Sequence, residues 1–233
     1  MKFSDLQLDK RILQAVEQVG YTQPSPIQAQ AIPPALEGRD VLGCAQTGTG
    51  KTAAFALPVL NRMTRETQRS ERIIRALILT PTRELALQID ESIRAYGKFL
   101  PYRVGTLIGG VKPGAQIEML KKGVDVLVAT PGRLLDLHAQ GLIDLTRLAF
   151  FVLDEADRML DMGFIHDVKK VIGIIPAKRQ TMFFTATMPP EIDKLAKSLL
   201  YHPVSVAVNP VSSTVDLTEQ IVYFSDKASK TDL

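Results

Sequence analysis

The sequence is poor in cysteine, histidine and aromatic residues. Its 233 residues include one cysteine, three histidines and no tryptophan. The single Cys44 excludes an internal disulfide, and the histidines are too scattered for the usual spacing of zinc ligands. No apolar run approaches the roughly 20 residues of a membrane-spanning helix, and the first residues lack an apolar signal segment. We therefore expect a cytoplasmic protein with no membrane partner.

The sequence also lacks a strong excess of charge of either sign. Its 28 lysines and arginines exceed its 25 aspartates and glutamates by only three. Net charge alone therefore gives no indication of nucleic-acid binding, and any basic surface has to be local. Hydrophobic residues make up 45% and charged residues 23%, which is typical of a globular protein with a substantial core.

Short apolar runs without polar alternation recur along the chain, a pattern typical of strands buried on both faces of a parallel sheet. The segments between them have helical periodicity; Leu85, Ile89 and Ile93, for example, fall on one helix face. We therefore expect an α/β fold in which helices cover both faces of a mostly parallel central sheet. The predicted strands span residues 41–45, 76–79, 104–108, 124–129, 150–153, 182–184 and 204–208.

A helix is also predicted ahead of the first strand. Ile12, Val16 and Val19 recur at helical spacing, and Asp9 is a suitable N-cap residue. We expect these three apolar residues to share one buried face and Gly20 to end the helix.

The composition changes after Val208. Residues 209–218 are rich in Pro, Ser, Thr and Asn, as in a linker, and residues 219–225 have the character of a strand. We assign residues 1–208 to one domain and residues 209–233 to a linker with the start of a truncated second domain. A lone strand presents an unpaired edge, so we also consider a dimer formed through this tail.

A glycine-rich segment connects the first predicted strand to a helix. It differs from the phosphate-loop pattern G-x-x-x-x-G-K-[ST] at its first position, Ala45. In such a loop, backbone N–H groups and the helix N-terminus bind phosphates, Lys51 reaches the β and γ phosphates, and Thr52 helps to hold Mg²⁺. The predicted nucleotide-binding residues here are Ala45, Gln46, Thr47, Gly48, Thr49, Gly50, Lys51 and Thr52.

Carboxylates follow the strand predicted at residues 150–153, at a position where open α/β sheets bind ligands. Asp154 is suited to hold Mg²⁺, largely through water, and Glu155 is suited to orient or deprotonate an attacking water. With Lys51, they are the candidate catalytic residues. Asp157 has two interpretations, a capping or interdomain contact and a coupling role.

The glycine-rich loop and the string Asp154-Glu155-Ala156-Asp157 resemble the DEAD-box RNA helicases. The resemblance implies a RecA-like P-loop NTPase domain, with ATP and Mg²⁺ as cofactors. It makes residues 1–208 the first RecA-like domain and residues 209–233 the connection into a second one. Residues 124–137 and 158–167 resemble the bacterial RhlE-type branch.

Residues 20–28, Gly-Tyr-Thr-Gln-Pro-Ser-Pro-Ile-Gln, resemble the family's Q motif, which reads adenine. The amide of Gln28 offers a donor and an acceptor that match the N6 and N7 edge of adenine. An aromatic ring such as Tyr21 can stack on the base, and Phe3, seventeen residues before Gly20, belongs to the same resemblance as a nucleotide-binding candidate. Core packing is the alternative for both aromatic residues.

Three further segments resemble the family's RNA-facing motifs, and each follows a predicted strand. The resemblance implies contacts with the RNA backbone that do not depend on base sequence. For Arg83 and Arg133, a salt bridge within the protein is the alternative. The implied RNA-binding residues are Pro81, Thr82, Arg83, Gly109, Gly110, Thr130, Pro131, Gly132 and Arg133.

Thr185, Ala186 and Thr187 occupy the place where the family usually has Ser-Ala-Thr, the motif that couples nucleotide state to unwinding. Threonine keeps the hydroxyl of serine, so we expect hydrogen bonding to the acidic motif to be retained. These residues and Asp157 are the candidate coupling residues.

The resemblance implies an ATP-dependent RNA helicase that binds ATP and single-stranded RNA and locally unwinds RNA duplexes. In the family, the second RecA-like domain supplies arginines that complete the ATP site, and no arginine-rich motif of that kind follows Thr187. An arginine finger is worth about 10³ to 10⁵ in rate, or roughly 4 to 7 kcal/mol. We therefore expect this chain to bind ATP or ADP but to hydrolyse ATP near background.

Two other interpretations share many of these features. One is a P-loop helicase or translocase that acts on DNA. The other is an RNA-binding or partner-binding module that does not hydrolyse ATP. Gln28, as a reader of adenine upstream of the phosphate loop, favours the RNA helicase over the first alternative.

Overall fold

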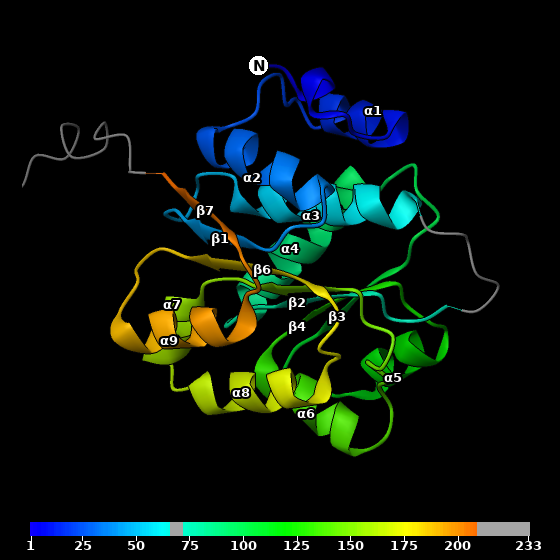
Figure 1. Cartoon of the computed structure of the whole chain (residues 1–233). Helices are drawn as coiled ribbons and strands as arrows, with labels where there is room; N and C mark the ends of the chain where they lie inside the picture. Colours follow the sequence, from blue (N-terminus) through cyan, green and yellow to red (C-terminus); the bar gives the residue numbers. More distant parts are fainter. Residues whose placement is uncertain (66–71, 209–233) are drawn as a thin grey trace, which may run out of the picture.

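In the computed structural model, residues 1–65 and 72–208 are described. The predicted strand at 219–225, the linker and the proposed tail-mediated dimer lie outside these residues. Within them, helices cover both faces of a central sheet (Figure 1). No helix in this part of the chain is long and apolar enough to cross a membrane.

Seven strands form the sheet, in the order β3-β4-β2-β5-β6-β1-β7. Every hydrogen-bonded pair of strands is parallel. The predicted α/β fold is therefore confirmed, and each of the seven strands lies within two residues of its predicted bounds. The strands are β1 Val41–Cys44, β2 Ala76–Leu79, β3 Val104–Leu107, β4 Val126–Ala129, β5 Phe150–Leu153, β6 Gln180–Thr185 and β7 Val204–Ala207.

Helices near the N-terminus cover one face of the sheet, and the later helices cover the other (Figure 1). On the first face, α1 lies outermost and packs against α3 and α4. The first group is the 3₁₀ helix η1 Phe3–Leu6, α1 Lys10–Gln18, α2 Pro26–Leu36, α3 Lys51–Thr64 and α4 Arg83–Tyr96. The second group is α5 Gly114–Lys121, α6 Pro131–Ala139, α7 Ala156–Asp161, α8 Ile165–Ile174 and α9 Pro190–Leu199.

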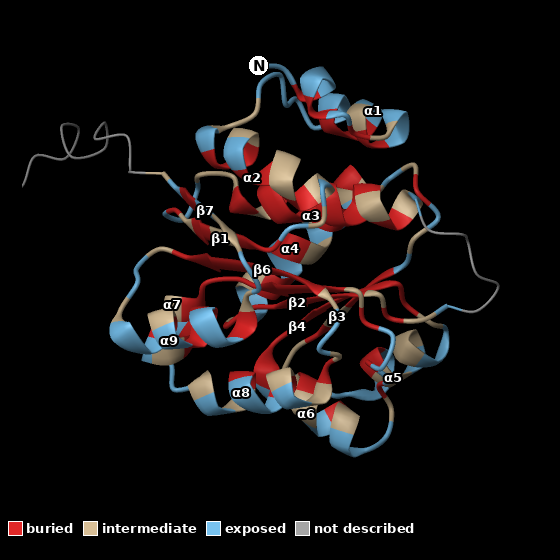
Figure 2. Cartoon of the chain, in the orientation of Figure 1, coloured by how far each residue is buried: buried red, intermediate tan, exposed pale blue. Residues whose placement is uncertain are grey.

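Side chains alternate between two apolar clusters, one on each face of the sheet. Ile78 of β2 and Val152 of β5 belong to the cluster that includes α3, whereas Leu79 and Leu153 belong to the cluster that includes α8. Figure 2 shows the central strands buried between the two helix layers. Because both faces are covered, the strands read as continuous apolar runs in the sequence.

The N-terminal helix was predicted correctly except at its end. The side chain of Asp9 caps α1 by accepting a hydrogen bond from the backbone N–H of Arg11 at 2.9 Å. Ile12 and Val16 are buried, but Val19 is 41% exposed. The prediction that Val19 shares the buried face was wrong, because the helix ends at Gln18 and Val19 is already its C-cap.

Candidate functional site

The predicted functional segments all lie at one edge of the sheet, because they follow the carboxyl ends of parallel strands. The phosphate loop follows β1, the acidic segment follows β5, and residues 185–187 end β6. The predicted RNA-facing segments follow β2, β3 and β4. In the sheet, β5, β6 and β1 are consecutive, as are β3, β4 and β2. The two sets of segments therefore occupy adjacent halves of the edge, which meet between β2 and β5.

The phosphate loop runs from Ala45 to the N-cap of α3 at Gly50. Gly48 and Gly50 have φ angles of +84° and +92°, a conformation that glycine adopts without strain. Ala45 does not require this freedom, because it continues the sheet pairing and donates its N–H to the carbonyl of Thr185 at 3.0 Å. The departure from the strict phosphate-loop pattern therefore falls where a Cβ is tolerated.

Ser25 and Gln28 hold the phosphate loop from the N-terminus of α2. The Ser25 hydroxyl donates to the carbonyl of Thr49 at 2.7 Å, and Gln28 Nε2 donates to the carbonyl of Gly50 at 3.1 Å. Gln28 Oε1 accepts from the Ser25 N–H at 2.9 Å. A glutamine amide still has one N–H and one lone pair left, so this geometry is compatible with adenine binding, which stays a prediction. Ser25 was not predicted; its S-x-x-Q spacing ahead of a helix is the signal that could have found it.

Lys51 and Asp154 are charged groups buried next to the loop. Lys51 is 6% exposed, and its Nζ has no hydrogen-bond partner among the described residues. Burial raises the pKa of Asp154 to about 6, which the Lys51 ammonium partly counters. A buried, unpartnered ammonium is unfavourable, and a phosphate group would supply its missing acceptors.

The donor set fits a hydrated Mg²⁺ that is bound together with phosphates. Asp154 offers a carboxylate, and Thr52 follows Lys51 in the first turn of α3. In the described ranges, no group of three or more His, Cys, Asp or Glu side chains could hold a metal by itself. Mg²⁺ commonly uses one or two carboxylates and takes its remaining ligands from phosphates and water.

Glu155 is held in a strained conformation. Its φ of +52° is rare for a residue with a side chain, and such residues cluster at functional sites. The buried carboxylate accepts a hydrogen bond from the Thr47 hydroxyl at 3.4 Å and pairs with Arg158 at 3.1 Å. These contacts join the phosphate loop to the acidic segment. Arg158 was not predicted, although its i,i+3 spacing from Glu155 on α7 could have indicated the pair.

Asp157 connects the acidic segment to residues 185–187. Its Oδ2 accepts hydrogen bonds from the N–H groups of Ala186 at 3.2 Å and Thr187 at 2.8 Å, and from the Thr187 hydroxyl at 2.9 Å. The expected hydrogen bonding to the acidic motif is thus present. The hydrogen bonds to Asp157 come from Ala186 and Thr187. The Thr185 hydroxyl instead donates to the carbonyl of Thr187 at 2.7 Å. Burial raises the pKa of Asp157, but the hydrogen bonds from residues 185–187 together outweigh it, so the pKa lies below its usual value.

In the half of the edge where the segments predicted to contact RNA lie, two arginines converge on the loop after β3. Arg83 Nη1 donates to the carbonyl of Gly109 at 3.4 Å, and Arg133 Nη2 donates to the carbonyl of Val111 at 2.8 Å. Gly110 has a φ of +74°, and the Arg83 guanidinium lies where a Cβ at this position would be. The structure therefore brings together three segments that lie far apart in the sequence.

A salt bridge within the protein was the alternative role for Arg83 and Arg133, and the structure supports it only in part. Arg133 Nε lies 3.8 Å from a carboxylate oxygen of the exposed Asp136. Its Nη1 is buried and has no hydrogen-bond partner in the described part of the chain. This guanidinium therefore keeps unused donor capacity.

The N-termini of two helices also lie in the half of the edge that is predicted to contact RNA. Thr82 is the N-cap of α4, and its hydroxyl accepts from the N–H of Leu85 at 3.2 Å. Thr130 is the N-cap of α6, with Pro131 in the first turn, and its buried hydroxyl donates to the carbonyl of Leu107 at 3.4 Å. Helix N-termini offer unpaired N–H groups to anions such as phosphates.

The two aromatic residues predicted to contact adenine pack against each other. Phe3 is 5% exposed, and its ring lies 6.0 Å from that of Tyr21, at an angle of 20°. The Tyr21 hydroxyl is hydrogen-bonded to that of Tyr96 at 3.1 Å. This arrangement is the packing alternative for Phe3, and stacking of either ring on adenine stays a prediction.

The sequence was compared with models of known protein families. The model of the DEAD/DEAH box helicases matches residues 25–195. The chain belongs to this family. The DEAD-box resemblance is therefore confirmed, whereas the RhlE-like branch stays a prediction.

Relatives of this DEAD-box chain include bacterial RNA helicases. It is 44% identical to the ATP-dependent RNA helicase CshA of Limosilactobacillus reuteri, over 94% of this chain and 44% of that protein. It is 42% identical to RhpA of Helicobacter pylori, over 96% of this chain and 45% of that protein. The chain thus spans less than half the length of these relatives.

The fold is also similar to a solved structure, that of a hypothetical ATP-dependent RNA helicase from Sulfolobus tokodaii. The TM-score is 0.79 at 36% identity, and the match covers 86% of this chain and 57% of that one. The RecA-like fold predicted for the DEAD-box chain is therefore confirmed.

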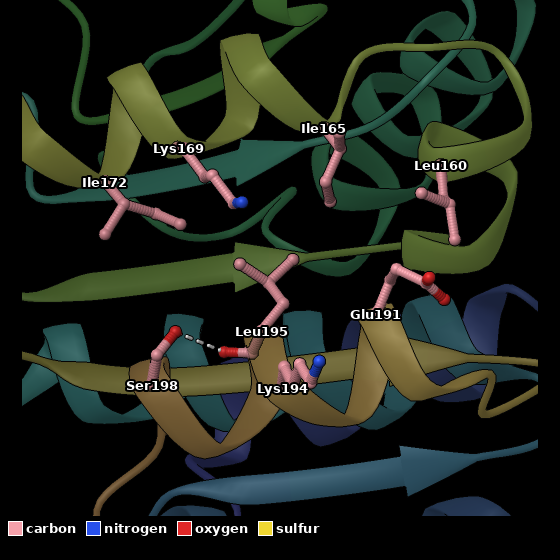
Figure 3. Close-up of a pocket in the computed structure, with 8 residues that line it drawn as sticks. All are labelled: Leu160, Ile165, Lys169, Ile172, Glu191, Lys194, Leu195 and Ser198. Carbon is pink, nitrogen blue, oxygen red and sulfur yellow. Dashed lines mark hydrogen bonds between the residues drawn. The ribbon is translucent and has the colours of Figure 1, made fainter.

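A separate groove of 570 Å³ lies between α8 and α9 (Figure 3). Ile165 and Ile172 line it from α8, and Leu195 lines it from α9, with Lys169 and Glu191 among the charged residues at its margin. None of the predicted site residues lines this groove.

Proposed function

We propose that this DEAD-box protein is an ATP-dependent RNA helicase of the cytoplasm, and that this chain contributes the domain that binds ATP–Mg²⁺ and single-stranded RNA. The observation that carries the proposal is that the phosphate loop and the acidic segment lie in one half of a sheet edge, and the segments predicted to contact RNA lie in the adjacent half. The names of the relatives, which are ATP-dependent RNA helicases, support it.

In the nucleotide half, the residues act through charge and position. Backbone N–H groups of the loop from Ala45 to Gly50 bind the phosphates, and the Lys51 ammonium neutralises the β and γ phosphates. The remaining N–H and lone pair of Gln28 read adenine. Phe3 and Tyr21 lie against the base when it is bound.

Hydrolysis depends on the residues of the acidic segment. Glu155, fixed by Thr47 and Arg158, orients the attacking water and accepts its proton. Thr52 and Asp154 would hold Mg²⁺, largely through water, and the bound ion would supply positive charge that neutralises the phosphates. Asp157 transmits the nucleotide state to Thr187 through the hydrogen bonds described above.

RNA binds across the other half of the edge. Arg83 and Arg133 contact phosphates with their guanidinium groups, while the N-termini of α4 and α6 add N–H donors at Thr82 and Thr130. Contacts of this kind position a strand without reading its bases. The proposed contact residues are Pro81, Thr82, Arg83, Gly109, Gly110, Thr130, Pro131, Gly132 and Arg133.

A second RecA-like domain completes the site in this proposal. It brings arginines to the phosphates, and the 233-residue chain alone therefore binds nucleotide and RNA but does not unwind duplexes. The domain assignment, with residues 1–208 as the first domain and the remainder as the connection, belongs to the same proposal.

Equilibrium binding of fluorescent ADP and GDP by the 233-residue chain tests the nucleotide half, and binding of single-stranded RNA and DNA of the same base sequence tests the other. We expect ADP to bind at least about fivefold more tightly than GDP, since a mismatched hydrogen-bonding edge costs at least about 1 kcal/mol. Equal affinities for ADP and GDP would contradict the role of Gln28. A preference for DNA over RNA would favour the DNA-helicase interpretation.

A further inference from the structure

Thr80 is a buried polar residue that none of the interactions described above explains. It directly follows β2, at the junction between the two halves of the edge. The residue is 0% exposed, and its hydroxyl has no hydrogen-bond partner among the residues that the structure describes. Leaving a buried hydroxyl unpaired costs about 1–3 kcal/mol, which a valine of similar shape would avoid. A partner for this hydroxyl is therefore needed from outside the residues that the structure describes.

The backbone places Thr80 beside Asp154. Leu79 of β2 is paired with Leu153 of β5, so the next residues, Thr80 and Asp154, are neighbours across the two strands. The pairing continues past the strand ends, because the Asp154 N–H donates to the carbonyl of Leu79 at 3.0 Å. Adjacent strands lie about 4.8 Å apart, so the two side chains emerge close together.

Both side chains emerge on the face that α3 covers. Ile78 and Val152, two residues earlier in each strand, belong to the apolar cluster that includes α3, and side chains alternate along a strand. Lys51 begins α3, and its charge is close enough to lower the pKa of Asp154.

Asp154 thus has two buried polar neighbours, Thr80 on the adjacent strand and Lys51 at the start of α3. The Thr80 hydroxyl and the Lys51 ammonium are both unpartnered among the described residues. A buried water needs two to four polar partners, and Mg²⁺ in nucleotide sites keeps several of its waters.

We propose that Thr80 is a further positioning residue of the nucleotide site, whose hydroxyl accepts a hydrogen bond from a water of the Mg²⁺ shell that Asp154 also holds. The inference rests on the proposed function, because it requires that ATP–Mg²⁺ binds here. It adds to that function the residue that directly follows β2, in the segment that leads into Thr82 and Arg83 of the half predicted to contact RNA.

The test is the effect of Mg²⁺ on ADP affinity in Thr80→Val, Thr80→Ser and the unmodified chain, measured with Mg²⁺ and with EDTA. For Thr80→Val, we expect the gain in affinity that Mg²⁺ provides to fall by roughly three- to tenfold, the value of one hydrogen bond. Affinity in EDTA stays unchanged, and thermal stability without nucleotide is equal or higher. Thr80→Ser keeps the hydroxyl, so its Mg²⁺ effect stays close to that of the unmodified chain.

Thr106→Val is the matched control, because it makes the same change in β3 of the same sheet. The Thr106 hydroxyl donates to Asp90 Oδ1 at 2.8 Å, so this variant loses stability but keeps the full Mg²⁺ effect. If Thr80→Val does not fold, Thr80→Ala provides the same comparison with Thr80→Ser.

The outcomes separate this inference from the proposed function. If the unmodified chain binds ADP more tightly with Mg²⁺ and Thr80→Val does the same to an equal extent, the role of Thr80 is wrong while the proposed function stands. If the unmodified chain does not bind ADP, both are wrong.

Discussion

The Asp157 carboxylate accepts two hydrogen bonds from Thr187 on a single oxygen, one from the backbone N–H at 2.8 Å and one from the hydroxyl at 2.9 Å. Asp157 lies at the start of α7, and Thr187 lies just beyond β6. The contact therefore joins the ends of two neighbouring strands in the nucleotide half. Because hydrogen bonds to a charged group are stronger than those between neutral groups, this contact is a suitable point for transmitting a change in the site.

Removing either partner of this contact should destabilise the protein. We expect Thr187→Val to lower the free energy of unfolding by about 1 kcal/mol and Asp157→Ala to lower it by about 1–3 kcal/mol, the range for hydrogen bonds to charged groups. Denaturant unfolding of both variants and the double mutant measures the coupling. Asp167→Ala, which breaks an exposed ion pair with Lys170, should change stability by less than about 0.5 kcal/mol. Strictly additive effects of the first two substitutions would show that the contact carries no energy.

The buried carboxyl of Asp154 should make stability depend on pH in the protein free of nucleotide and metal. Its pKa is raised from 3.8 to about 6, so between these values the folded state binds a proton that the unfolded state releases. Stability therefore falls as pH rises through this window and levels off above it. Asp154→Asn removes the effect, and its stability relative to the unmodified chain should increase across the window by about 3 kcal/mol. Unfolding at several pH values checks this; parallel curves for the two proteins would count against it.

Lys51 should be unfavourable for stability and necessary for binding. Lys51→Met removes a buried ammonium, unpartnered among the described residues, so at about pH 5, where most of the buried Asp154 carboxyl is protonated, we expect thermal stability to be equal or higher without nucleotide. The affinity for ADP should fall by roughly 10- to 100-fold, because charge-assisted hydrogen bonds to phosphate are lost. Lys10→Met, at an exposed position of α1, should leave both quantities unchanged. Unaltered ADP affinity in Lys51→Met would show that the phosphates bind elsewhere.

The sequence predicted the strands and the chemistry of the loops, but not how the loops are distributed. Continuous apolar runs such as Phe150–Leu153 can be recognised as strands in the sequence because both faces of the sheet are covered. The order of the strands cannot be recognised in this way, since nothing local to β2 specifies that β4 and β5 are its neighbours. The contact of Arg83 with Gly109 and the position of Thr80 beside Asp154 both depend on that order. The left-handed conformation of Glu155 likewise arises from tertiary contacts that a local pattern does not encode.

Arg83→Ala and Arg133→Ala should each weaken the binding of single-stranded RNA to a similar degree for all base sequences. Each loses about one phosphate contact, so the slope of log affinity against log salt should become less steep by about 0.7. Arg147→Ala is the control, because this exposed arginine precedes β5 and lies toward the opposite edge of the sheet. RNA titrations over a series of salt concentrations measure the slope. An effect confined to particular base sequences would point to base recognition in place of backbone contacts.

The most direct test of the account is ATP turnover by the folded 233-residue chain, with and without single-stranded RNA. We predict that ADP binds but that turnover stays at background in both conditions, because in the proposed function the arginines that complete the site belong to a second domain. Turnover stimulated by RNA would contradict this, and would mean that another copy of the chain supplies the missing charge or that none is needed.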